Sequence, residues 1–162
     1  MVRQRYFLTS DDYANVHQCD RWARFVDAQV AAIDFVGGEG LLMAPTIAVS
    51  QLLARNGLTL QDFDFYEIHE AFAGQVLCTL KAWESDNYCK NVLKLDKALG
   101  PIDVIKINTQ GSSIALGHPF AATGARIVAT LAKMLKEKGA GRGLISICTA
   151  GGMGVAAILE AV

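Results

Sequence analysis

The sequence predicts an α/β fold: a mixed, mainly parallel sheet of five strands with helices on both of its faces. Short apolar runs typical of strands alternate with longer stretches of helical periodicity, and this alternation favours parallel strands joined by helical crossovers. The last two apolar runs are joined by a tight glycine-rich turn, which favours an antiparallel final pair. The 162 residues are enough for one domain with a sizeable core.

The N-terminal part of the chain predicts a strand followed by a helix. Residues 1–24 mix charged and aromatic side chains without a clear period, so they form an unassigned leader or a short helix, and the folded domain is expected over 25–162. The apolar run at 25–33 indicates a strand. A helix is expected from Pro45, which suits the first helical turn, to Asn56, which is followed by a glycine that ends it.

The middle of the chain predicts two strands with a helix between them. Residues 63–68 alternate well enough for a short strand, and a helix follows to about Trp83. The polar stretch 84–101 is expected to be a loop with one helical turn around 92–99. A further strand is expected at 104–107.

The C-terminal part predicts a long helix and a pair of strands. After a turn rich in glycine and serine, the helix is expected to start at Pro119 and to end at Gly139, with lysines near its negative pole. A fully apolar strand is expected at 143–148. A glycine-rich turn leads from it into the last strand at 155–159.

Composition excludes several classes of function. The chain is 52% hydrophobic and 19% charged, which fits either a subunit or domain interface or a core-heavy α/β domain. A net charge of −1 argues against nucleic-acid binding, and the absence of a long apolar run argues against a transmembrane helix or a signal peptide. The four cysteines show no CxxC spacing and no histidine cluster, which predicts no metal site and a reducing compartment.

Two histidines lie where chemistry is expected. His118, within Gly117-His118-Pro119, is predicted at a helix N-terminus, where the helix dipole favours the neutral imidazole that accepts a proton near pH 7. The alternative is an exposed turn residue. His69, which begins His69-Glu70-Ala71-Phe72, lies at a strand-to-helix junction, the position where α/β sheets bind ligands. The alternative there is helix capping, with Glu70 favoured by the dipole.

A cysteine forms the third candidate. Cys148 ends an apolar strand directly before a turn that contains Gly151, and glycines in such a turn let a ligand approach the backbone closely. A cysteine with a tuned pKa acts as an acid or a base. The alternative is inert packing. Because His69, His118 and Cys148 follow predicted strands, a parallel sheet would bring them to one edge, beside exposed backbone N–H groups suited to carbonyl chemistry.

These motifs, in this order, resemble the C-terminal half of thiolases, which are acyl-CoA acyltransferases. The resemblance covers about residues 26–162. The form His69-Glu70-Ala71-Phe72, where many thiolases have Asn-Glu-Ala-Phe, looks like the thiolase subunit of fatty-acid β-oxidation multienzyme complexes. Two further stretches point the same way, namely 120–126 and 84–103.

The resemblance implies roles for the three candidates. His118 would activate the nucleophilic cysteine of the family and help to bind the thioester oxygen. His69 would hold a water, or itself donate, in the same oxyanion hole. Cys148 would be the acid/base that takes the α-proton in condensation or returns it in thiolysis.

The resemblance also implies binding roles, with two departures from the family pattern. The backbone N–H of Ala150, beside Gly151, would contribute to a second oxyanion hole, and Ala71 and Phe72 would line the acyl or pantetheine path. The family usually has glycine where Ala150 stands and two glycines where Gly111-Ser112 stands. Both departures predict an altered fit rather than lost chemistry.

The implied reaction is cleavage of a 3-ketoacyl-CoA by CoA to acetyl-CoA and a shortened acyl-CoA, or the reverse condensation. The resemblance implies no cofactor and no metal, with CoA as a substrate. The nucleophilic cysteine of the family belongs to an N-terminal half, and Cys19 lies in no comparable motif, so the chain alone is expected to be inactive. The full-length form is expected to be a homodimer, with a hydratase/dehydrogenase subunit as a further partner, in the bacterial cytoplasm or the mitochondrial matrix.

Two other interpretations stay open. The chain could be a non-catalytic thiolase-like module for dimerisation or interaction, which fits its high apolar content. It could also be a relative of ketoacyl synthases, which likewise pair a cysteine with two imidazoles. The position of Cys148 favours the thiolase interpretation over the second of these.

Overall fold

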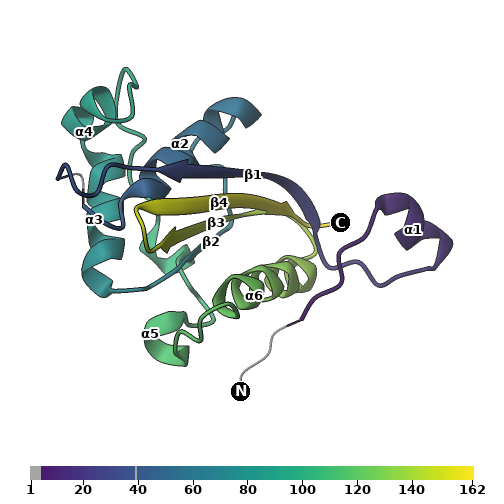
Figure 1. Ribbon diagram of the computed structural model, residues 1–162. Coiled ribbons are helices and arrows are strands. Elements are labelled where there is room, and N and C mark those ends of the chain that lie inside the picture. The colour runs from purple at the N-terminus through teal and green to yellow at the C-terminus, as the bar shows by residue number, and fades with distance from the viewer. Residues whose placement is uncertain (1–4, 39) are drawn as a thin grey trace.

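The computed structural model describes residues 5–38 and 40–162. In this part of the chain a single four-stranded sheet runs through the centre in the order β1-β4-β3-β2 (Figure 1). Strand β4 pairs antiparallel with β1 and β3, whereas β2 pairs parallel with β3. The bounds are β1 (Arg24–Ala32), β2 (Phe65–Ile68), β3 (Arg142–Thr149) and β4 (Met153–Glu160).

The α/β class and the mixed sheet are confirmed, but the number and direction of the strands differ from expectation. Two of the three ladders are antiparallel, so the sheet is not mainly parallel. The segment expected as a strand at 104–107 is the 3-10 turn η1 (Val104–Lys106), and only an isolated bridge joins Ile107 to Tyr66 of β2. The Asp103 side chain accepts a hydrogen bond from a backbone N–H of this turn, which favours the turn over a fifth strand.

Helices cover both faces of the sheet. Helix α2 packs against β1, β3 and β4, and α6 packs against the opposite face (Figure 1). As predicted, α2 ends at the left-handed Gly57 and α6 ends at the left-handed Gly139. The helices are α1 (Asp11–Val16), α2 (Ala44–Asn56), α3 (Ala73–Glu84), α4 (Asp86–Asn91), α5 (Ser113–Leu116) and α6 (Thr123–Lys138).

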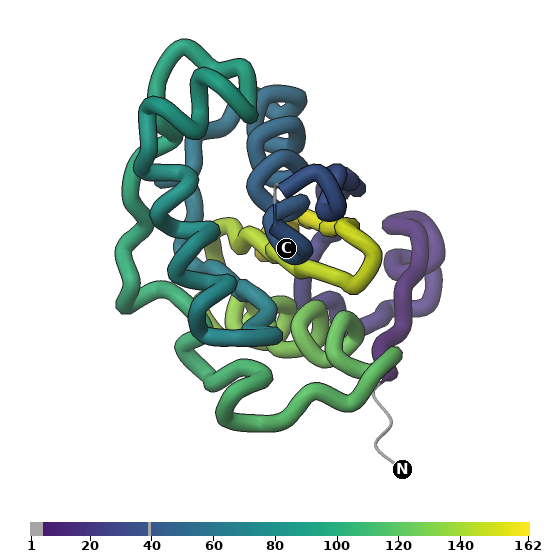
Figure 2. Tube along the Cα trace, turned by 60° about the vertical axis from the view of Figure 1, so that its left-hand side comes forward, coloured from purple at the N-terminus to yellow at the C-terminus, as the bar shows by residue number. Residues whose placement is uncertain are grey.

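Two helical expectations need correction. The helical turn expected around 92–99 lies earlier, as α4, because the Ser85 side chain caps it by accepting a hydrogen bond from the Tyr88 N–H. The long helix α6 starts at Thr123 and not at Pro119. The segment between η1 and α6 passes close to the start of α3 in both views of the chain (Figures 1 and 2).

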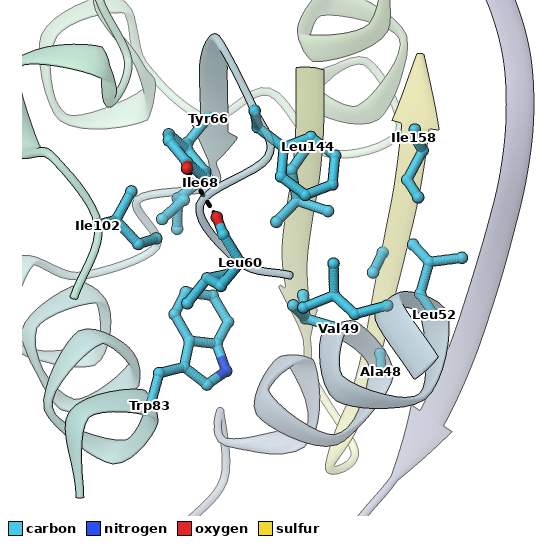
Figure 3. Packing of buried hydrophobic residues seen from close by; sticks show 13 residues of the cluster. Ala48, Val49, Leu52, Leu60, Tyr66, Ile68, Trp83, Ile102, Leu144 and Ile158 are labelled. Carbon is cyan, nitrogen blue, oxygen red and sulfur yellow. Dashed lines mark hydrogen bonds between the residues drawn. The ribbon is translucent and has the colours of Figure 1, made fainter. Parts of the chain in front are cut away.

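Each face of the sheet has its own apolar cluster. The cluster under α2 contains large side chains such as Trp83 and Tyr66, both almost fully buried (Figure 3). The Tyr66 hydroxyl donates to the Leu60 carbonyl at 2.7 Å, so this buried hydroxyl is satisfied. The cluster under α6 is smaller and is built around Leu131 and Ile145. Within the described ranges, no helix combines the length and the apolar character that crossing a bilayer requires.

Candidate functional site

The structure brings His69, His118 and Cys148 together at one end of the parallel pair β2 and β3. His69 follows β2, and its backbone N–H donates to the Ser146 carbonyl at 2.9 Å, so the ladder continues to this residue. The rings of His69 and His118 have their centroids 4.3 Å apart and are tilted by 51°. The backbone of Ala71, two residues beyond His69, acts on the pKa of the Cys148 thiol, and Cys148 lies two residues beyond Ser146, the partner of Ile68. Segments far apart in the sequence therefore share one small region.

Contrary to the sequence prediction, His118 is not at the start of a helix. It lies in the link between α5 and α6, five residues before Thr123 begins α6. The left-handed backbone of Ala121, at φ 64°, interrupts the chain between Pro119 and the helix. His118 therefore lies in an irregular link before α6 and not in the first turn of that helix.

Hydrogen bonds around His118 determine which ring nitrogen carries the proton. The Thr123 hydroxyl donates to the Pro119 carbonyl at 3.3 Å, because a carbonyl oxygen can only accept. The same hydroxyl oxygen lies 2.7 Å from His118 Nδ1, so Nδ1 is the donor of that bond. The neutral ring then has an unprotonated Nε2, which can accept a proton. The exposed ring of Phe120 packs beside it at 4.9 Å between centroids.

His69 is buried, with 2% of its surface exposed. Its Nδ1 lies 2.9 Å from the Ser113 hydroxyl oxygen. The pKa of His69 is lowered to about 4, first by burial and then by the nearby His118 and Arg126, against the opposing effect of Glu70. The imidazole is therefore neutral at pH 7, mainly because it is buried.

Cys148 is also buried, with 4% of its surface exposed. Burial raises the pKa of its thiol, against opposing hydrogen bonds from the backbone N–H groups of Cys148 and Ala71. At neutral pH the group is therefore a protonated thiol that can give up a proton rather than a standing thiolate.

The other predicted site residues lie beside these three. Ala150 and Gly151 are exposed in the turn that follows β3, and Ala71 is half-buried just before α3. Phe72 is 67% exposed. In this turn the absence of a side chain at Gly152 has a structural reason, because a Cβ there would lie 2.8 Å from the Ile33 carbonyl oxygen and 2.7 Å from a Phe35 ring carbon.

A second set of residues, which the sequence did not single out, holds the segment before α5 against β2. The Asn108 side chain accepts from the Ile68 N–H at 2.8 Å and donates to the Ile68 carbonyl at 2.9 Å. It also donates to Glu70 at 2.8 Å, and the other Glu70 oxygen accepts from the Ile114 N–H at 3.2 Å. Glu70 therefore links the end of β2 to the segment that contains Asn108 and Ile114, and it is not the helix cap considered above. Its partners lie about 40 residues away, so no local signal could identify them.

A buried carboxyl group, that of Glu67, is the other feature that sequence reasoning missed. Glu67 of β2 is fully buried, and its two carboxylate oxygens have no hydrogen-bond partner among the described residues. Burial raises the pKa of Glu67 to about 7; the Arg126 guanidinium opposes this shift and Glu70 adds to it. Arg126 Nη2 donates to the Ser113 hydroxyl oxygen at 3.4 Å. A glutamate inside the apolar run of β2 was the one available signal.

The described residues contain no cluster of side chains suited to bind a metal ion. Over residues 5–38 and 40–162, no group of three His, Cys, Asp or Glu side chains is placed to hold a metal ion. All four cysteines are free thiols, namely Cys19, Cys78, Cys89 and Cys148. The site therefore offers imidazoles, a thiol and backbone N–H groups.

Comparison with known proteins adds a family to this geometry. Residues 20–161 match the family described as "Thiolase, C-terminal domain". The chain is 48% identical over 130 residues to a 3-ketoacyl-CoA thiolase of Alteromonas mediterranea, covering 80% of this chain and 29% of that protein. It is 46% identical over 121 residues to a probable 3-ketoacyl-CoA thiolase of Caenorhabditis elegans, covering 75% and 27%.

Solved structures agree with the sequence comparison. Human mitochondrial 3-ketoacyl-CoA thiolase superposes with a TM-score of 0.74 at 33% identity, over 94% of this chain and 34% of that one. The dimeric peroxisomal thiolase of Saccharomyces cerevisiae superposes with a TM-score of 0.74 at 34% identity, over 93% and 33%. The chain thus spans between about a quarter and a third of the length of these proteins.

Proposed function

The chain belongs to the thiolase family as a C-terminal domain, and from this premise we propose that it supplies the acid–base half of a thioester site. The proposed reaction is thiolytic cleavage of a 3-ketoacyl-CoA to acetyl-CoA and a shortened acyl-CoA, or the reverse condensation. The observation that carries the proposal is the convergence of His69, His118 and Cys148 at the end of β2 and β3. The nucleophilic cysteine is assigned to another part of a longer enzyme, so the chain alone is inactive.

His118 is the general base in this proposal. Its unprotonated Nε2 takes the proton of the nucleophilic thiol, and the resulting thiolate attacks the 3-keto carbon. The bond between C2 and C3 of the substrate then breaks, and its electron pair stays on C2 as the enolate of acetyl-CoA. The support for this role is the hydrogen bond that places the ring proton on Nδ1.

Cys148 is the acid that completes the cleavage. Its buried thiol gives a proton to C2 of the enolate, and in the reverse direction the thiolate takes that proton back. CoA thiol then gives its proton to the Cys148 thiolate and attacks the acyl-enzyme thioester; the shortened acyl-CoA is released, and the departing cysteine takes back the proton held by His118. A protonated thiol at neutral pH is the state that thiolysis requires, which supports this assignment.

Oxyanion stabilisation and substrate binding fall to the neighbouring groups. His69 donates to the thioester oxygen, or holds a water that does so, and the backbone N–H of Ala150 with Gly151 beside it forms a second oxyanion hole. Removal of one such donor typically costs about 10²–10³ in rate. Ala71 and the exposed Phe72 line the acyl or pantetheine path.

The setting of the full-length enzyme is part of the proposal. It uses CoA as a substrate, with neither metal nor cofactor, and works in the bacterial cytoplasm or the mitochondrial matrix. We expect a homodimer, supported by the yeast relative that is described as dimeric, with a hydratase/dehydrogenase subunit as a further partner.

A second candidate function is a non-catalytic thiolase-like module that mediates dimerisation or interaction. One observation favours it: Cys148 is buried and its pKa is raised, as in an inert core cysteine. Cys148→Ala in the full-length protein, assayed by thiolysis of acetoacetyl-CoA, separates the candidates. Loss of turnover supports the catalytic role, and unchanged turnover supports the module.

The decisive experiment is His118→Ala in a full-length enzyme that contains this domain, assayed by thiolysis of acetoacetyl-CoA. Loss of a general base predicts a fall in kcat of about 10²–10⁴. The matched control is His17→Ala, since His17 follows α1 and packs on Tyr13, outside the site. Near-normal turnover of the His118 variant would refute the general-base role, and thiolysis by the 162-residue chain itself would refute the claim that it is inactive alone.

A further inference from the structure

We propose that Arg126, acting through Ser113, is a positioning residue that fixes His69 in the tautomer carrying its proton on Nε2. The proposal deepens the proposed function, on which it rests only for the use made of that proton. Neither Arg126 nor Ser113 was singled out by the sequence. Both lie next to the site, Arg126 in α6 and Ser113 at the start of α5.

The chain of hydrogen bonds runs from Arg126 to Ser113 to His69. Arg126 Nη2 lies 3.4 Å from the Ser113 hydroxyl oxygen, and this oxygen lies 2.9 Å from His69 Nδ1. A guanidinium group can only donate, so the Ser113 oxygen accepts from Arg126. The hydroxyl has one hydrogen of its own, and among the described residues the acceptor within hydrogen-bond distance is His69 Nδ1.

This arrangement determines the protonation of the imidazole. A ring nitrogen that accepts a hydrogen bond carries no proton, so Nδ1 of His69 is bare and the single proton of the neutral ring is on Nε2. With the opposite tautomer, the Ser113 oxygen would accept two donors and its own hydrogen would be left without an acceptor. Ser113 is only 6% exposed, so that unmade hydrogen bond would be costly.

A doubly protonated His69 is also disfavoured. The ring is buried, and the charged or titratable groups that act on it are His118 and Arg126, which oppose protonation, and Glu70, which favours it. The net effect is a pKa of about 4. Arg126 therefore acts twice on His69, once through Ser113 on the tautomer and once directly through its charge.

The result is a pair of imidazoles with opposite hydrogen-bonding character. His69 presents an Nε2 donor, whereas Thr123 leaves His118 with an Nε2 acceptor, and the two rings lie 4.3 Å apart. A developing oxyanion needs the donor and a thiol proton needs the acceptor, so a single site requires both. If His69 changed its tautomer, both rings would present lone pairs and the oxyanion donor would be lost.

The test reads the tautomers directly by NMR of the chain labelled with 15N-histidine, at neutral pH, with signals assigned by their loss in His69→Gln and His118→Gln. We expect His69 protonated on Nε2 and His118 protonated on Nδ1. In Ser113→Ala or Arg126→Met, His69 should become a mixture of tautomers while His118 keeps its own. In Arg126→Met the pKa of His69 should also rise, and Ser113→Thr, which keeps the hydroxyl, should preserve the tautomer.

The neighbouring serine provides the matched control. Ser112 is also buried, but its hydroxyl donates to the Ile68 carbonyl at 3.3 Å, whereas the hydroxyl beside His69 Nδ1 belongs to Ser113. Ser112→Ala should therefore leave the His69 tautomer unchanged. A His69 ring protonated on Nδ1 in the unaltered chain overturns the proposal, even if no variant folds. A pure Nε2 tautomer that persists in both Ser113→Ala and Arg126→Met overturns the positioning role.

The NMR result is independent of turnover. An inactive His118→Ala enzyme tests the proposed function, whereas the tautomer of His69 is read in the absence of substrate. Failure of one proposal can therefore be told apart from failure of the other.

Discussion

The face of the sheet covered by α2 and the face covered by α6 bury different kinds of side chain. On the α2 face, Tyr66 and Ile68 of β2 join a large apolar cluster with Trp83 (Figure 3). On the α6 face, Phe65 packs against the smaller cluster, and two residues further along the same strand comes the buried Glu67, which interacts with Arg126. Alternation along a single short strand thus supplies both a core and a buried charge.

This difference between the two faces shows that one mainly stabilises the fold and that the other also carries groups next to the site. Apolar burial stabilises the fold, whereas a buried carboxylate without hydrogen bonds destabilises it. The buried group that destabilises the α6 face is the Glu67 carboxylate, which lies near His69 at one end of that face. We infer that the α2 face contributes more of the folding free energy and that the α6 face gives up stability next to the site.

The largest expected effect on stability tests the α2 face. Trp83→Ala should lower the free energy of unfolding by about 3–5 kcal/mol, because it empties a fully buried position in the centre of the core. Trp83→Phe is the control, since it keeps most of the volume and removes an indole N–H that has no partner among the described residues. Urea unfolding measures both. A loss below about 1 kcal/mol for Trp83→Ala would contradict the central role of this cluster.

The next prediction compares the two faces at matched glycines. A Cβ at Gly154 would lie 2.5 Å from the backbone nitrogen of Pro45 at the start of α2, and backbone cannot move aside cheaply. A Cβ at Gly143 would lie 2.3 Å from Cδ1 of Leu131 in α6, the end of a flexible side chain. We therefore expect Gly154→Ala to cost about 3 kcal/mol and Gly143→Ala about 1–2 kcal/mol in urea unfolding. The reverse order would contradict the tighter packing of the α2 face.

The third prediction concerns the pH dependence of the α6 face. The pKa of Glu67 is raised to about 7, so the folded chain binds a proton there more tightly than the unfolded chain does. The resulting stability is complete at acid pH and is lost as the pH rises through 7. Glu67→Gln should therefore unfold with a free energy about 2 kcal/mol higher than the unaltered chain at pH 8, with little gain near pH 4.

Glu137, an exposed residue of α6, provides the control for the Glu67→Gln experiment. Glu137→Gln removes a carboxylate that is 63% exposed, and it should show no comparable gain at pH 8. His69 contributes with the opposite sign, because its pKa is lowered and the unfolded chain binds the proton more tightly below about pH 6.5. That contribution is present in both variants and cancels from their comparison. Equal pH profiles for Glu67→Gln and the unaltered chain would show that Glu67 is not a buried, strained carboxylate.

The smallest effect is expected on the solvent side of α6. Lys133 pairs with Glu137 at 3.6 Å, and both side chains are more than 60% exposed. Lys133→Ala should change the free energy of unfolding by about 0.5 kcal/mol or less. Thermal unfolding at low and high salt checks this. A loss above about 1 kcal/mol would mean that the cost of changes on α6 is not confined to its buried side.

Local signals in the sequence were sufficient for most of the elements. Pro45 at the start of α2 and the glycines that follow α2 and α6 act through their own backbone preferences, so the sequence identified the ends of these helices. The tight glycine-rich turn between β3 and β4 was also predicted from the sequence. The meeting of His69 with Cys148 also followed from the sequence, because β2 and β3 are parallel and their carboxyl ends lie side by side.

The tertiary structure decided the rest, because it depends on contacts between residues far apart in the chain. The segment 104–107 forms a turn instead of a strand, and His118 is held in a link rather than at a helix start. The position of that link depends on Asn108 and Glu70, which join segments about 40 residues apart. Such hydrogen bonds leave no periodicity or local composition to detect.

The sequence by itself determined the residue types of this site and the family to which they belong. Only the tertiary structure decided their protonation, since that depends on which groups surround each ring. His69 is neutral because it is buried beside Arg126. Burial and hydrogen-bond partners are properties of the folded chain, and they convert two histidines of one type into a donor and an acceptor.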